Sequence, residues 1–315
     1  MRNFFAAALA LTASSVLAQE GMSWDEREEV FAFDDVVGRY GYFYEKYEVQ
    51  TEDEWTLTLF RIKGRNAPTK PNPVFFMHDL MMDAASWLNS YEDDVPLPMQ
   101  LVDQGYDVWM GNNRGTRFSL ENPLYPYGDN VYSIYAYLTE NALKYDYDWM
   151  TMGELDLPPM LDKVRAVTNN AKLTYVGIGQ GTSQLLYALT QKEEEYYDEI
   201  LNKALLISPC VYMQTEDLDW YNEVYPKYRQ QFINVFNDPN WQYDLDSLCQ
   251  TPGFEAACQE GQKYRGQQES TRSMELFHQI AISGRFQKWS PSFSTDPLSG
   301  EVVTPGLESI DKVLI

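Results

Sequence analysis

Histidine and positive charge are both scarce in this sequence of 315 residues. Its 2 histidines leave little choice for a general base, and neither lies near the 3 cysteines, so we expect no metal site and no cofactor. Lys and Arg total 24 against 47 Asp and Glu, a net charge of −23 that is spread along the chain. A surface of this sign repels phosphate, which excludes nucleic acid as an expected partner.

Long hydrophobic runs are also missing after the first residues, since no later stretch approaches the roughly 20 apolar residues of a membrane helix. The opening "MRNFFAAALALTASSVLA" has a positive start at Arg2, an apolar centre and small residues at its end. This pattern predicts a signal peptide cleaved near Ala18, with a retained anchor as the alternative. We therefore expect a chain without a transmembrane anchor, secreted or delivered to the endolysosomal lumen.

The few cysteines fit an oxidising compartment with one disulfide bond. Cys249 and Cys258 lie in a polar, turn-rich stretch, and a bond between them closes a loop of about ten residues, worth roughly 3 kcal/mol in the chain-entropy model. Cys210 ends an apolar run and is expected to be a buried free thiol.

Short apolar runs alternate with helix-length segments. Residues 44–63 alternate apolar and polar side chains around a charged turn, which predicts a hairpin. Four unalternated apolar runs follow, as expected for strands covered on both faces: 73–78, 106–112, 173–179 and 203–210. Helical spacing over 154–170 and a helix over 180–189 complete the pattern of an α/β protein with a mostly parallel sheet.

A change of composition marks a third part of the chain. Residues 213–275 are rich in Tyr, Trp, Asn and Asp and contain no strand of the earlier type, so we expect a helical cap, or lid, over the sheet. The expected division is a signal peptide (1–18), a core with an N-terminal hairpin (19–212), the cap (213–275) and a truncated return to the core (276–315).

Several motifs, in one order, resemble the acid lipase family of gastric lipases, lysosomal acid lipase and steryl ester hydrolases. "FFMHDLMMDAASWLNS" is similar to the family's His-Gly-Leu oxyanion segment, and "LVDQGYDVWMGNNRGTRFS" to its Gly-Tyr-Asp-Val-Trp-x-Gly-Asn-x-Arg-Gly segment. "YVGIGQGTS" stands where Gly-x-Ser-Gln-Gly-Thr belongs, and "SMELFHQIAISGRFQKW" resembles the helix after the lid. The resemblance implies an α/β-hydrolase fold with a helical cap, a Ser-Asp-His triad acting on neutral-lipid esters, and a cap disulfide at Cys249 and Cys258.

The chain departs from this family at the nucleophile. Gly179 occupies the serine position of the strand-to-helix turn and has no side chain. Thr182 and Ser183 lie nearby, but one turn inside the following helix, so we interpret both as helix residues.

The other two triad members are expected to be absent as well. His78 and His278 match family positions with structural roles, and the sequence ends at the approach to the strand that would carry the catalytic Asp. The last strands of the sheet are then missing, which predicts an unpaired edge that a protein partner could cover.

The oxyanion hole is kept in part. The backbone N–H groups of Leu80 and Gln180 match its two donors, but Asp79 replaces the family's glycine. A carboxylate roughly 5 Å from a developing oxyanion would oppose it by about 3 kcal/mol at an effective dielectric of 20, if the side chain points inward.

These observations favour an inactive lipase relative, involved in lipid metabolism, that binds a neutral lipid or ester or engages a protein partner. Loss of a serine nucleophile typically lowers the rate by about 10⁶-fold, which makes ordinary lipase turnover implausible. The alternatives are an active lipase or carboxylic ester hydrolase on triacylglycerols or steryl esters, and a structural or interaction protein without a ligand.

Overall fold

A single twisted sheet organises the part of the chain that the computed structural model describes, residues 33–88, 94–124, 144–191, 194–211, 270–304 and 313–314. Among these residues the strand order is β1-β2-β4-β3-β5-β6-β7. The strands are β1 (Phe43–Gln50), β2 (Thr56–Lys63), β3 (Val74–Met77), β4 (Val108–Gly111), β5 (Leu173–Ile178), β6 (Leu201–Ile207) and β7 (Val313–Leu314). β1, β2 and β4 pair antiparallel, and the pairs from β4 to β7 are parallel.

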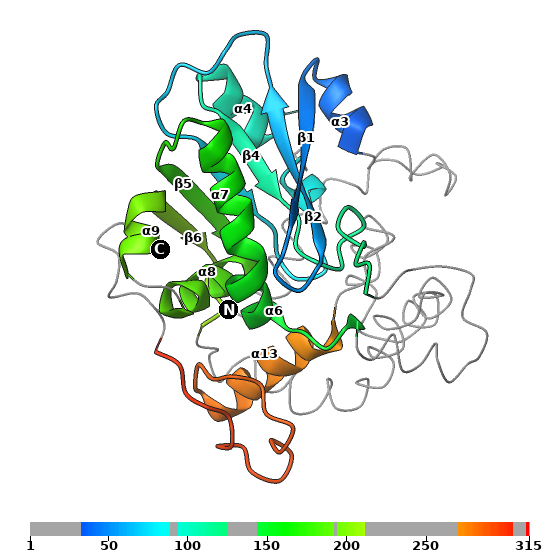
Figure 1. Cartoon of the computed structure of the whole chain (residues 1–315), viewed down its shortest axis with the longest axis vertical. Coiled ribbons are helices and arrows are strands. Elements are labelled where there is room, and N and C mark those ends of the chain that lie inside the picture. Colours follow the sequence, from blue (N-terminus) through cyan, green and yellow to red (C-terminus); the bar gives the residue numbers. More distant parts are fainter. Residues whose placement is uncertain are drawn as a thin grey trace, which may run out of the picture.

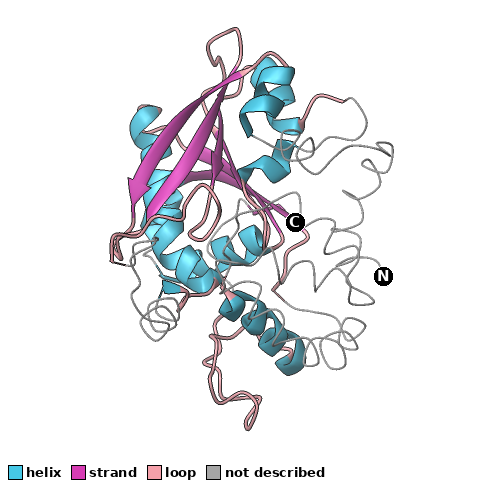
Figure 2. Ribbon diagram, turned by 90° about the vertical axis from the view of Figure 1, so that its right-hand side faces the viewer, coloured by secondary structure: helices cyan, strands magenta, loops and turns pink. Residues whose placement is uncertain are grey.

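Helices cover both faces of this sheet (Figures 1 and 2). In chain order they are α3 (Phe33–Arg39), η1 (Ala84–Leu88), α4 (Leu97–Asp103), α6 (Trp149–Thr151), η2 (Met152–Asp156), α7 (Leu157–Val167), α8 (Gln180–Gln191), α9 (Glu194–Ile200) and α13 (Thr271–Ser283). The predicted hairpin, the four apolar strands and the two helices are all present, and the fold is that of an α/β-hydrolase.

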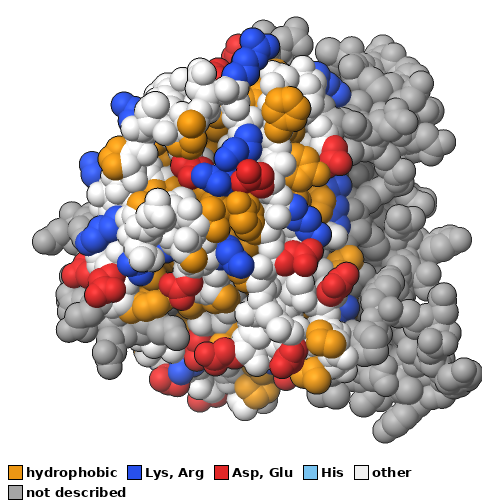
Figure 3. Space-filling view, turned by 45° about the horizontal axis from the view of Figure 1, so that its top comes forward, with side chains coloured by type: hydrophobic (Ala, Val, Ile, Leu, Met, Phe, Trp, Pro, Cys, Tyr) orange, Lys and Arg blue, Asp and Glu red, His pale blue; other side chains and the backbone are white. Residues whose placement is uncertain are grey.

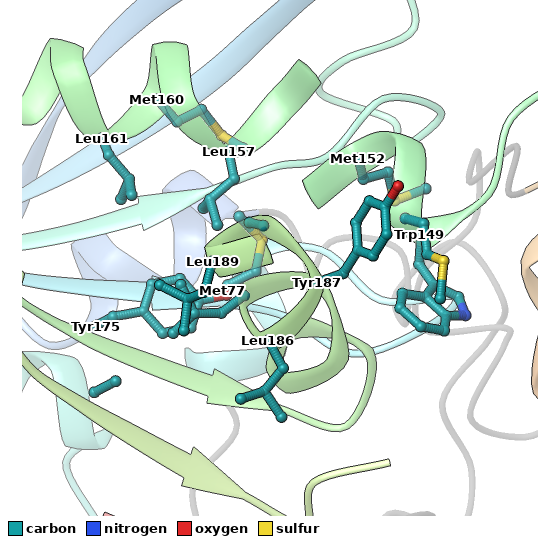
Figure 4. Close-up of a cluster of buried hydrophobic side chains, with 14 of the residues drawn as sticks. Met77, Trp149, Met152, Leu157, Met160, Leu161, Tyr175, Leu186, Tyr187 and Leu189 are labelled. Carbon is teal, nitrogen blue, oxygen red and sulfur yellow. The ribbon is translucent and has the colours of Figure 1, made fainter. Parts of the chain in front are cut away.

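Alternate residues of the central strands supply two hydrophobic cores. On β3, Phe75 and Met77 point to the core under α7 and α8, whereas Val74 and Phe76 point to the core under α3 and α4. Figure 4 shows the first core, where Leu157, Met160 and Leu161 of α7 lie above Met77, Tyr175 and the α8 side chains. All four residues of β3 are buried, which explains why its sequence does not alternate.

Local signals fix several helix ends. Asp148 accepts hydrogen bonds from the backbone of Met150 and Thr151 and forms a capping box for α6. Ser270 caps α13 through the N–H of Arg272, and Gly284 ends it with a φ of 65°. The boundary at 275 that composition indicated therefore falls inside α13, which begins at Thr271.

The edge beyond β6 differs from the expectation of missing strands. Val313 and Leu314 pair parallel with Ala204 and Leu205, so the last described residues begin a further strand beside β6. The expected open edge is thus covered in part by the chain itself.

Charges of both signs are mixed on the face shown in Figure 3, with hydrophobic side chains between them. Within the described residues, no helix has both the length and the apolar character to cross a bilayer. The signal peptide, Cys249, Cys258 and most of the cap lie outside the described residues.

Candidate active site

The strand-to-helix turn between β5 and α8 keeps the geometry of a nucleophile elbow. Gly179 lies between the two elements with a φ of 50°, in the left-handed region. A Cβ on Gly181 would lie 2.9 Å from the carbonyl oxygens of both His78 and Met77, and one on Gly177 would lie 2.8 Å from Cε1 of Tyr175. The flanking glycines are thus needed for the close approach of α8 to β3 and β5.

The hydroxyl groups after the turn are committed to the backbone. Thr182 Oγ1 donates to the carbonyl of Gly179 at 2.6 Å, and Ser183 Oγ donates to the carbonyl of Cys210 at 2.8 Å. Both residues are fully buried. This arrangement agrees with their interpretation as helix residues and leaves neither hydroxyl in the position of an elbow nucleophile.

The side chain of Asp79 occupies the space that the missing serine leaves. A Cβ built on Gly179 would lie 2.0 Å from Oδ1, 2.1 Å from Cγ and 2.2 Å from Oδ2 of Asp79. Asp79 lies two residues after the end of β3, so the carboxyl ends of two neighbouring parallel strands bring the two residues together. The sequence indicated an inward carboxylate only as a condition, and it left out that this group fills the nucleophile position itself.

Both donors of the expected oxyanion hole bind this carboxylate. The N–H of Gln180 donates to Asp79 Oδ1 at 2.6 Å, and the N–H of Leu80 donates to the same oxygen at 2.7 Å. Burial raises the pKa of Asp79 to about 6, although the two amides act to lower it. The two expected donors therefore converge on one oxygen of a side chain of the protein itself.

His78 is held between two backbone groups. Its ring is fully buried, Nε2 accepts the N–H of Asn113 at 3.1 Å, and Nδ1 lies 2.8 Å from the carbonyl oxygen of Asp79. Because Nε2 accepts, the proton is assigned to Nδ1, which donates to that carbonyl. Burial lowers the pKa of this imidazole, so it is neutral and has no ring nitrogen left to act as a base.

The second histidine, His278, lies on α13. Its ring centroid is 6.0 Å from that of Phe293 in an edge-to-face contact. The structure thus places the histidines in separate parts of the fold. Of the residues that the sequence singled out, Asp79, Leu80, Gly179 and Gln180 meet at the turn, and His78 and Thr182 hydrogen-bond to the backbone carbonyls of Asp79 and Gly179.

Residues after β4 form the support of this site. Asn113 and Gln184 exchange side-chain hydrogen bonds of 3.1 and 2.8 Å, which join the β4 loop to α8. Arg114 is buried and pairs with Asp156 at 2.6 Å and Asp53 at 2.5 Å. The sequence motif Asn-Asn-Arg-Gly marked this segment, but not these partners, because they come from distant parts of the chain.

Metal binding finds no support in the described residues, where no group of three His, Cys, Asp or Glu side chains converges. Cys210 is a thiol, as expected, but it is partly exposed rather than buried, and its Sγ donates to the carbonyl of Ser208.

Comparison with known proteins finds lipases among the similar sequences. Residues 33–91 match the family model described as a partial alpha/beta-hydrolase lipase region. The chain is 31% identical to Lipase 1 of Drosophila melanogaster, over 61% of this chain and 40% of that protein. It is 33% identical to Triacylglycerol lipase 2 of Arabidopsis thaliana (55% and 39% covered) and 32% identical to human Lipase member K (50% and 38% covered). The chain thus spans about two fifths of the length of these relatives.

Solved structures with a similar arrangement include two esterases from Bacillus subtilis. Carboxylesterase CesB is 11% identical, with a TM-score of 0.41 and 76% of this chain and 67% of that chain covered. Naproxen esterase is 11% identical, with a TM-score of 0.38 and 80% and 72% covered. These scores are low, and the fold assignment rests on the strand order and the connections of the sheet.

Proposed function

We propose, from the premise that the chain belongs to the acid lipase family of α/β-hydrolases, that this member binds a neutral lipid or ester without hydrolysing it. One observation carries the proposal: the elbow has no nucleophile at Gly179, and the carboxylate of Asp79 fills the space where an acyl-enzyme would form. The names of the relatives support a lipid or ester as the ligand class. The predicted signal peptide supports a secreted or endolysosomal location, and the names of the relatives support a role in lipid metabolism. Engagement of a protein partner is the alternative to lipid binding.

The absence of hydrolysis is tested on the purified chain. We expect no turnover of short-chain p-nitrophenyl esters or triolein, and no covalent labelling by a fluorophosphonate probe, because Gly179 offers no atom to acylate. Trace activity that falls away on repeated purification comes from a contaminant, whereas turnover that survives it would contradict the absence of hydrolysis. Stoichiometric labelling of the wild-type chain would overturn the proposal and favour the active lipase that the relatives' names suggest.

Ligand binding is tested separately by lipid extraction and mass spectrometry of the purified protein. We expect a triacylglycerol or steryl ester to co-purify and to be displaced by added fluorescent cholesteryl ester. A chain that carries no lipid and binds none, yet associates tightly with another protein, would instead support the structural or interaction role.

A further inference from the structure

The carboxylate of Asp79 has the position and contacts of a bound ligand. A single oxygen, Oδ1, accepts both backbone donors of the hole, at 2.6 Å from Gln180 N and 2.7 Å from Leu80 N. Two converging N–H groups at this distance are the arrangement that stabilises an oxyanion. Both oxygens and Cγ of Asp79 lie within 2.0–2.2 Å of the position that a Cβ on Gly179 would take, so the whole carboxyl group fills the space of the missing side chain.

The backbone of Asp79 is fixed in place by neighbouring residues. The carbonyl of Asp79 accepts from Nδ1 of His78, and the other ring nitrogen of His78 accepts from Asn113. The backbone at Asp79 is therefore anchored on the β3 side, while its carboxylate reaches the N-terminus of α8.

Gly179 and Asp79 depend on each other sterically. Any Cβ at position 179 would overlap the carboxyl group, at 2.0–2.2 Å from its three terminal atoms. A glycine at 79 beside a serine at 179, the family pattern, would empty the hole and restore a side chain at the elbow. The two replacements together exchange a catalytic side chain for a carboxylate from the neighbouring strand.

We infer that Asp79 is an intramolecular ligand of a carboxylate-binding site formed by the Leu80 and Gln180 amides, and that it keeps ester carbonyls and fatty carboxylates out of this site. The inference rests on the proposed non-hydrolytic function in treating Gly179 as the native elbow residue. It has a consequence for that function: a lipid bound by this protein places its ester carbonyl away from the hole.

A different role for Asp79, as a simple cap of α8, makes a different prediction. A cap stabilises the helix end through the same hydrogen bonds, and water takes its place when it is removed. Two N–H groups that converge on one point instead bind an added carboxylate in the emptied hole. Asp79→Asn is the matched control, because its side-chain oxygen still fills the hole.

The experiment is rescue of Asp79→Gly by acetate, followed by thermal unfolding at pH 7 with sodium chloride of equal ionic strength as the reference. We expect a lower Tm for Asp79→Gly in chloride and a saturable rise of about 2–5 °C at acetate concentrations tenfold above the dissociation constant. The wild-type chain and Asp79→Asn, in which the hole stays filled, should show no acetate-specific rise. An equal rise in Asp79→Asn, or none in Asp79→Gly, would overturn the inference.

A second measurement decides the matter if Asp79→Gly does not fold. The backbone amide resonances of Leu80 and Gln180 in the wild-type chain should shift together on titration, with a midpoint near the pKa of about 6 of Asp79. The same resonances should not titrate in Asp79→Asn. Independent midpoints, or a titration that persists in Asp79→Asn, would contradict the assigned contact. If these resonances do not titrate as expected, the proposed absence of hydrolysis still depends on the labelling test alone. Stoichiometric labelling would contradict the absence of hydrolysis without changing the titration expected of these resonances.

Discussion

At the level of single residues, Asp79 supplies an acceptor for the Leu80 and Gln180 amides, although position 179 has no side chain. The amides of Leu80 and Gln180 would be buried donors without an acceptor if nothing entered the hole, which costs about 1–3 kcal/mol per group. The carboxylate satisfies both. Burial removes water from this carboxylate and disfavours its charged form, and for this reason its pKa is raised to about 6.

The raised pKa gives the first prediction. The folded-state pKa of Asp79 is about 6, above its ordinary value of 3.8, so the folded state binds the proton more tightly. The contribution of Asp79 is fully present below about pH 3.8 and is lost as the pH rises through 6. The side chain in Asp79→Asn does not titrate. As the pH rises from 4 to 7, the free energy of unfolding of this variant should therefore increase relative to that of the wild type, by up to about 3 kcal/mol.

Urea unfolding at several pH values between 4 and 7.5 measures this difference. Glu52→Gln, at an exposed position, is the control and should run parallel to the wild type. A constant gap between Asp79→Asn and the wild type across the range would contradict the burial of an ionised carboxylate.

The steric exchange between positions 79 and 179 gives the second prediction. Gly179→Ser places a Cβ at a φ of 50° and within 2.2 Å of the carboxyl atoms, so we expect a loss of about 2–4 kcal/mol of unfolding free energy. In the Asp79→Gly background the overlap is absent, and the same change should cost about 1–2 kcal/mol less.

Gly41→Ser isolates the backbone part of this effect. Gly41 has a φ of 76°, and a Cβ there would meet nothing within 4 Å. Its cost should be the same in both backgrounds, as measured by a double-mutant cycle in urea. Additive effects of Gly179→Ser and Asp79→Gly would refute the direct contact.

At the level of secondary structure elements, the position of α8 depends on glycine contacts with the loop after β3. Gly181 lies against the carbonyl oxygens of Met77 and His78, and a Cβ there would come within 2.9 Å of each. Because backbone atoms cannot move aside like the end of a side chain, Gly181→Ala should destabilise the fold by about 2–4 kcal/mol and displace the Gln180 amide.

The control for this third prediction is Gly38→Ala in α3, where a Cβ meets nothing within 4 Å. Alanine is the better helix former, so this variant should be neutral or more stable by up to about 1 kcal/mol. Thermal unfolding of the two variants compares them directly, and equal Tm values would show that α8 adapts to the added methyl group.

Much of the secondary structure could be predicted from the sequence. The hairpin, the buried strands and the start of α8 after the glycines follow from apolar periodicity and from turn residues, which act over a few neighbouring positions. The edge beside β6 could not, because the pairing of Ala204 with Val313 joins segments that no local pattern connects.

At the level of the whole molecule, Arg114 connects three distant segments. It pairs with Asp53 of the β1–β2 turn and with Asp156 at the end of η2, and its guanidinium lies 5.4 Å from the ring centroid of Trp55. Asp156 is fully buried, and burial raises its pKa, although the pairing with Arg114 acts to lower it. In this cluster of ion pairs, the buried charge of Asp156 thus depends on its pairing with Arg114.

The fourth prediction concerns this cluster. Arg114→Met leaves the carboxylate of Asp156 without its buried partner, and we expect a loss of about 3–5 kcal/mol at pH 7. The pKa of Asp156 then rises further, so the folded state binds its proton more tightly and the loss should shrink as the pH falls toward 4. Arg114→Lys keeps the charge and should cost less. A loss that does not depend on pH would show that packing, rather than the unpaired carboxylate, dominates.

The sequence by itself determined the fold class, the resemblance to lipases and the absence of a side chain at position 179, because each depends on residue identity or on spacing along the chain. Only the tertiary structure decided what occupies the space that this absence leaves. Asp79 and Gly179 are separated by 100 positions, and they meet because β3 and β5 are parallel neighbours whose carboxyl ends lie side by side. The contact between them is a property of sheet register, which no local pattern of residues specifies.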